Sequence, residues 1–167
     1  MAGMSGLHVL AIQFTFSLVA FALLARWYVG PRLPTSSREA AVVPLLWIHV
    51  FRYAPLALYA TGQIDPRVPP DVAAAIGYGD LVSAVLALLA VCAAQLRAPF
   101  AIPLAWLFTV VGSGDLVYAT YKAVAAQLYR FYIGWNWYIL NLYVPMLIVS
   151  QVMMIQRLLG RSADAKE

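Results

Sequence analysis

Five long apolar runs constrain the fold of this chain more than any other feature of its sequence. As helices, they are long enough to cross about 30 Å of hydrocarbon at about 1.5 Å per residue. Charged residues make up 11% of the chain and hydrophobic residues 63%, whereas soluble domains carry roughly 25% charged residues. We therefore predict an all-α fold, an integral membrane bundle of five transmembrane helices in a single domain over residues 1–167. The expected helices cover about residues 7–29, 40–62, 72–96, 100–123 and 135–158.

The basic residues indicate how this bundle is oriented. Lysine and arginine collect in the cytoplasmic connections of membrane proteins. With the amino terminus outside, the cytoplasmic side receives Arg26, Arg32, Arg38, Arg97, Arg157, Arg161 and Lys166, and the outer side receives only Arg67, Lys122 and Arg130. We therefore predict an outside amino terminus and a cytoplasmic carboxyl terminus. The first run follows no basic segment and continues past Ala22, so we expect an uncleaved helix.

The second run contains an arginine near its middle. Arg52 lies about twelve residues into this run, and a charge at the centre of a transmembrane helix costs roughly 2.5–3.5 kcal/mol. Asp80 and Asp115 lie at similar depths in the third and fourth runs and are the candidate partners. Pro55 removes a backbone hydrogen bond and clashes with the carbonyl of Phe51, which predicts a kink beside Arg52.

Polar residues follow one face of several runs at helical spacing. His49, Arg52 and Tyr59 share a face of the second run with Leu56 and Gln63. We expect Arg52 to pair with Asp80, Asp115 or both, and His49 and Asn141 to complete the network. The candidate ligand or ion site comprises His49, Arg52, Tyr59, Asp80, Ser83, Asp115, Tyr118 and Asn141.

Two short segments of the third and fourth runs resemble each other. Gly77-Tyr-Gly-Asp80-Leu-Val-Ser-Ala recurs as Gly112-Ser-Gly-Asp115-Leu-Val-Tyr-Ala. The two runs are joined by a very short linker, so they form an antiparallel hairpin and the repeat is inverted. Duplicated transporter halves show internal symmetry of this kind. Coincidence, or a shared need for glycine in helix packing, explains the match equally well.

Three classes of function fit this polar centre. One arginine facing two carboxylates leaves an acceptor for a small ligand, a proton or an ion, which favours a protein that binds or translocates one of these. A structural or accessory subunit would use the ion pairs only to fix helix register. An enzyme acting on a lipid or isoprenoid would use Asp80 or Asp115 as acid or base and Arg52 as an anion holder. We expect a protein that is not an enzyme.

The sequence offers little for metal, cofactor or nucleic-acid chemistry. Cys92 is the single cysteine, and the two histidines, His8 and His49, lie at different depths, so we expect no metal site and no cofactor. A haem with His49 and a different axial ligand stays open. No basic run suggests a nucleic acid. The expected partners are membrane lipid, a small lipophilic or ionic ligand, and a second copy of the chain packed on the small-residue face Ala73, Gly77, Ala84, Ala87 and Ala94.

Residues 44–53 carry a resemblance to known proteins. Their sequence, Pro-Leu-Leu-Trp-Ile-His-Val-Phe-Arg-Tyr, resembles a segment of small bacterial inner-membrane proteins of about this length. The similarity extends over most of the chain. It implies a multi-pass protein of the bacterial inner (cytoplasmic) membrane, and it brings no established activity that could be carried over to these residues.

Overall fold

Every regular element in the described part of the chain is helical. The computed structural model describes residues 5–160. Five helical segments are long and apolar enough to cross a membrane: Gly6–Arg32, Arg38–Tyr59, Pro70–Gln95, Ala101–Ala125 and Asn136–Leu159. Each begins and ends within three residues of the run predicted for it. The predicted all-α fold with five such helices is confirmed.

Three of these segments change their helix type along their length. The elements in chain order are α1 (Gly6–Leu24), the π-helix η1 (Ala25–Val29), the 3-10 helix η2 (Gly30–Arg32), α2 (Arg38–Val50), the 3-10 helix η3 (Phe51–Tyr59), α3 (Pro70–Gln95), α4 (Ala101–Ala125), the 3-10 helix η4 (Leu128–Arg130), α5 (Asn136–Tyr138), the π-helix η5 (Ile139–Tyr143) and α6 (Val144–Leu159). Serine caps two of the starts. Ser5 caps α1, and the Ser37 side chain accepts a hydrogen bond from the Ala40 N–H at 3.1 Å at the start of α2.

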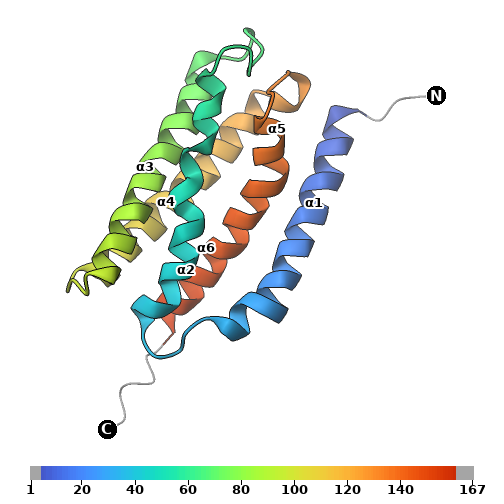
Figure 1. Ribbon diagram of the computed structural model, residues 1–167. Coiled ribbons are helices and arrows are strands. Elements are labelled where there is room, and N and C mark those ends of the chain that lie inside the picture. Colours follow the sequence, from blue (N-terminus) through green and yellow to red (C-terminus); the bar gives the residue numbers. More distant parts are fainter. Residues whose placement is uncertain (1–4, 161–167) are drawn as a thin grey trace.

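The bundle is arranged around an antiparallel hairpin of α3 and α4. These helices pack along each other, and α2 and η3 pack against α3 (Figure 1). Helix α6 contacts α2 and α4, whereas α1 lies at the edge of the bundle and packs on α6 and η5 (Figure 1). No residue of α1 is buried, and its apolar side chains surround the whole helix. Most of α1 is therefore free to face a surrounding apolar phase.

The small-residue face of α3 lies inside the chain. Ala73, Gly77, Ala84 and Ala87 are all buried within the bundle. A Cβ added at Gly77 would lie 2.9 Å from the ring of Tyr59, because the aromatic ring packs directly on the glycine. These four of the five residues expected to bind a second copy therefore let α3 approach its own neighbours, and association with a second copy stays a prediction.

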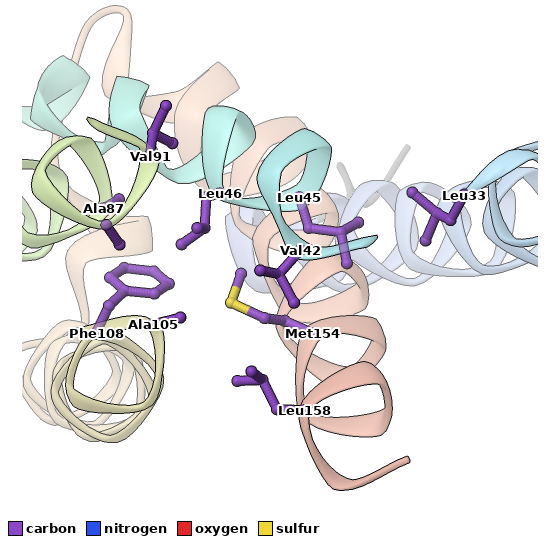
Figure 2. Packing of buried hydrophobic residues seen from close by; sticks show 11 residues of the cluster. Leu33, Val42, Leu45, Leu46, Ala87, Val91, Ala105, Phe108, Met154 and Leu158 are labelled. Atoms are coloured by element: carbon purple, nitrogen blue, oxygen red, sulfur yellow. The ribbon is translucent and has the colours of Figure 1, made fainter. Parts of the chain in front are cut away.

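One end of the bundle is filled by an apolar core. Its buried side chains come from four long helices and from the segment after η2: Leu33, Val42, Leu45, Leu46, Ala87, Ala90, Val91, Ala105, Phe108, Met154 and Leu158. Figure 2 shows the Phe108 ring reaching from α4 toward Leu46, with Met154 of α6 close to Val42. This core lies at the end of the bundle where α6 finishes (Figure 1).

The second segment changes from an α-helix to a 3-10 helix instead of simply bending. Pro55 lies within η3, which runs for nine residues, longer than most 3-10 helices. At the change, the carbonyl oxygen of Ile48 accepts a hydrogen bond from the Tyr143 hydroxyl at 2.6 Å. With three residues per turn, the buried positions become Arg52, Pro55 and Leu58. The predicted stripe through Leu56 and Tyr59 is wrong for this reason, and the Tyr59 side chain is half exposed.

Candidate functional site

The Arg52 side chain is fully buried and forms three hydrogen bonds. Its Nε donates to Asp80 Oδ1 at 2.8 Å, and its Nη2 donates to Asp115 Oδ2 at 2.7 Å. Its Nη1 donates to the backbone carbonyl of Gly112 at 3.0 Å. Arg52 thus contacts both carboxylates, which was one of the pairings predicted from the sequence. We call Arg52, Asp80 and Asp115 the Arg52 centre.

Glycines of the two repeated segments make room for this centre. Gly112 lies opposite the guanidinium, and a Cβ there would lie 3.1 Å from Arg52 Nη1. Gly79 lies opposite Asp115, where a Cβ would overlap the carboxylate oxygen Oδ1. Gly114, the repeat counterpart of Gly79, has open space around it. The two segments therefore meet in one site, but their glycines have different neighbours.

The Arg52 centre carries one positive group and two acidic groups. Ser83 donates a hydrogen bond to Asp115 Oδ2 at 3.3 Å, but a hydroxyl adds no charge. Among the described residues, the other ion pairs are Arg67 with Asp65 and Lys122 with Asp71, and both lie away from the centre. With both aspartates ionised, the centre has a net charge of −1. A buried charge of this kind requires a counter-charge or a bound proton.

Asp80 opens onto a cavity at the end of the bundle away from the apolar core. The cavity has a volume of about 70 Å³ and is lined mainly by apolar side chains of η3, α3, α4 and the fifth segment. Asn136 also lines it, is nearly fully buried, and has no hydrogen-bond partner for either side-chain polar atom. Unpaired buried amides are rare, so a polar occupant such as water fits this place. We call this space the Asp80 cavity.

The connection after α4 forms part of the wall of the Asp80 cavity. Leu128 and Ile133, from the connection after α4, line the cavity. This connection is tied to the one before α3, because the Asp65 N–H donates to the Tyr132 carbonyl at 2.8 Å. Hydrogen bonds from the Arg67 side chain and backbone lower the pKa of Asp65 to about 2. Asp65 is therefore ionised at neutral pH, and its hydrogen bonds with Arg67 stabilise the connection before α3.

Asp115 reaches the surface on the other side of Arg52. It lines an open groove between α3 and α4 together with Tyr78, Gly79 and Tyr118. Tyr118 is half exposed, as is Tyr59, so neither belongs to the buried part of the predicted site. The two carboxylates of the Arg52 centre thus face different spaces, the Asp80 cavity and the open groove between α3 and α4.

His49 and Asn141 lie outside the hydrogen bonds of the Arg52 centre. His49 is fully buried, its Nε2 is 2.9 Å from Ser150 Oγ, and its ring packs on Phe108. Asn141 donates from Nδ2 to the Trp137 carbonyl at 2.8 Å, one turn back in the same segment. The expected network through these two residues is corrected: His49 faces the apolar core, and the Asn141 amide donates within its own segment while its Oδ1 has no partner among the described residues.

The structure adds several polar groups that the sequence did not single out. Asn136 and Tyr143 line the Asp80 cavity, and the Gly112 carbonyl contacts Arg52. Gln151 donates to the Thr109 carbonyl and to Ser113 Oγ. No spacing rule identifies Asn136, since it lies in an aromatic stretch at the start of the fifth segment. Pro55 leaves the Phe51 carbonyl without its N–H donor, so it gives no signal for the Ile48 carbonyl that Tyr143 binds.

Comparison with known proteins places the chain in a family. Residues 9–159 match the model described as Domain of unknown function (DUF8737), and the chain belongs to this family. Because the match covers most of the chain, it includes the whole Arg52 centre. No curated protein matches the chain, and no solved structure matches it. The resemblance to a family without an established activity is therefore confirmed.

Proposed function

For this member of the DUF8737 family, we propose a multi-pass membrane protein whose Arg52 centre binds a proton or a small monovalent cation. The observation that carries the proposal is the charge of the centre. One fully buried guanidinium contacts two carboxylates, and no other basic group forms an ion pair with either carboxylate among residues 5–160. A proton or a monovalent cation supplies the missing positive charge and is small enough to need little room.

The surroundings of the centre support binding from one end of the bundle. Asp80 Oδ1 accepts a hydrogen bond from Arg52 Nε, and Asp80 lines the Asp80 cavity. Asn136 offers an amide there that is suited to a water or a hydrated ion. On the opposite side of Arg52, the apolar core fills the bundle (Figure 2), and the buried polar side chains of His49 and Ser150 lie against it. The Asp80 cavity thus supports binding from the other end of the bundle.

We expect the proton to be visible in the infrared spectrum. If an aspartate of the centre is protonated, the purified chain will show the C=O stretch of a carboxylic acid at neutral pH. This band will disappear in Asp80→Asn or in Asp115→Asn, because the charge of the one remaining carboxylate is balanced by Arg52 and no proton is needed. Asp71→Asn is the matched control, because Asp71 forms a surface ion pair with Lys122 and its variant will keep the band.

If the centre binds a monovalent cation instead of a proton, the same samples will give a different result. Without a carboxylic-acid band, sodium or potassium ions will raise the thermal midpoint relative to choline chloride. At a concentration one hundred times Kd, a bound cation stabilises the fold by about 2.7 kcal/mol. This stabilisation will be lost in Asp80→Asn. A wild-type chain with neither an acid band nor a cation-dependent midpoint contradicts the proposed function.

We further propose the bacterial inner membrane, with the amino terminus outside. The described arginines at the end of the bundle where the apolar core lies are Arg26, Arg32, Arg38, Arg97 and Arg157, which supports a cytoplasmic location for that end. Arg161 and Lys166 belong to the same predicted set and lie outside the described residues.

Cysteine labelling tests this orientation. In a Cys92→Ser background, a Ser36→Cys variant in the connection before α2 will react only after the inner face is made accessible to a membrane-impermeant maleimide. A Thr61→Cys variant in the connection after η3 will react in intact cells. Both positions are exposed, so access depends only on the side of the membrane. The reverse labelling pattern would establish the inverted topology.

A further inference from the structure

A long groove separates part of α1 and η1 from α6, at the end of the bundle where the apolar core lies. Its volume is about 660 Å³, within the range of roughly 300–1,000 Å³ that ligand pockets occupy. Leu18, Ala22, Val152 and Met153 provide much of its apolar lining, and Arg26 and Arg157 lie at its basic end. We call this space the α1–α6 groove.

The groove remains open because α1, η1 and η2 each place a small residue beside α6. Ala22, Ala25 and Gly30 all line it, and none carries a side chain long enough to fill the space. Val152 of α6 is half exposed, so the protein does not cover the apolar wall. In Figure 1, α1 lies at the edge of the bundle, so this wall is open to whatever surrounds the protein.

The basic end of the groove has unused hydrogen-bond donors. Arg157 donates from Nη2 to the Gly30 carbonyl at 3.0 Å, which leaves other guanidinium N–H groups available. Arg26 is exposed and forms neither an ion pair nor a side-chain hydrogen bond with the described residues. Guanidinium groups match phosphate oxygens in geometry and charge.

An apolar groove that ends at two arginines complements a phospholipid, which has apolar acyl chains and a negatively charged phosphate. We infer that the α1–α6 groove binds an anionic phospholipid, with its phosphate between Arg26 and Arg157 and an acyl chain along Leu18 and Ala22. Basic pockets between helices on the cytoplasmic side of membranes bind such head groups. This inference is independent of the Arg52 centre, because no residue is shared between the two sites.

Native mass spectrometry of the full chain with defined lipids tests this site. Phosphatidylglycerol will bind more tightly than phosphatidylcholine. The Arg26→Gln/Arg157→Gln double variant will bind phosphatidylglycerol about thirtyfold more weakly, because two juxtamembrane charges are lost. Arg97→Gln is the matched control, since Arg97 lies at the same end of the bundle and outside this groove, and it will bind as the wild type does.

A second pair of variants tests the apolar part without changing charge. Ala22→Trp will fill the groove and weaken phosphatidylglycerol binding at least tenfold, whereas Leu23→Trp on the next position of α1 will not, because Leu23 does not line the groove. Equal binding of the two lipids would overturn the inference. So would an Arg97→Gln effect as large as that of the double variant, or equal effects of the two tryptophans.

Discussion

Replacing Arg52 with alanine will lower the free energy of unfolding by about 3–5 kcal/mol, the range seen when one partner of a buried ion pair is removed. The physical reason is that Asp80 stays buried and Asp115 stays mostly buried after the guanidinium is gone, and each loses its Arg52 donor, at 2.8 and 2.7 Å. The Gly112 carbonyl loses a donor as well. Reversible unfolding of the purified chain in detergent measures the loss.

Neutralising the carboxylates as well will recover much of this stability. In the triple variant Arg52→Met/Asp80→Asn/Asp115→Asn no charge is buried, and replacing a buried ion network with neutral groups of similar volume is often neutral or stabilising. Lys122→Met is the control for charge removal in general. Lys122 pairs with Asp71 at 2.6 Å, but the Asp71 side chain is 66% exposed, so this loss will stay below about 1 kcal/mol. Arg52→Ala with a loss as small as Lys122→Met would show that the centre does not stabilise the fold.

The contact of Arg52 with both aspartates could be predicted from the sequence, because a buried charge needs an opposite charge and few residues can provide it. A guanidinium deep in an apolar helix needs acceptors, and only Asp80 and Asp115 lie at matching depths in the neighbouring runs. The hairpin of α3 and α4 follows from their short linker, which brings the two repeated segments side by side. The same counting placed His49 in the network because it lies one turn from Arg52. It missed that the His49 ring packs on Phe108 instead.

The change of helix type in the second segment could not be predicted. Pro55 indicates that one backbone hydrogen bond is lost, but both a kinked α-helix and a 3-10 helix can accommodate this loss. The choice depends on tertiary contacts, among them the Tyr143 hydroxyl that binds the Ile48 carbonyl. Because 3-10 and α-helices differ in residues per turn, the error moved the predicted stripe from Leu58 to Tyr59.

The Asp80 cavity was also beyond the reach of sequence patterns. It is formed where η3, α3, α4 and the fifth segment diverge under the connection of residues 126–135. Periodicity describes the faces of single helices, whereas a cavity depends on the gap between several of them. Asn136 became recognisable as a site residue only once its unpaired amide was seen to face this gap.

Gly79→Ala will destabilise the fold by about 1–3 kcal/mol, although alanine favours helices. A Cβ at Gly79 would overlap Asp115 Oδ1, so the carboxylate has to move. A flexible side chain usually moves at little cost. Asp115 is held by Arg52 Nη2 at 2.7 Å and by Ser83 at 3.3 Å, so its displacement breaks a charge-assisted hydrogen bond. In an Asp115→Ala background the same substitution will cost nothing, because the overlapping oxygen is absent.

Gly114→Ala is the matched control, since Gly114 occupies the same place in the second repeated segment. A Cβ there meets no atom within 4 Å, so the higher helix propensity of alanine will raise stability by up to about 1 kcal/mol. If Gly79→Ala lowers the stability and Gly114→Ala raises it, only Gly79 is required, and it is required by its contact with Asp115. The similarity of the two segments would then not reflect a general need for glycine in helix packing. If both substitutions stabilise the fold, Asp115 moves freely and its bond to Arg52 adds no stability. Unfolding midpoints of the four variants, measured side by side in one detergent, distinguish these outcomes.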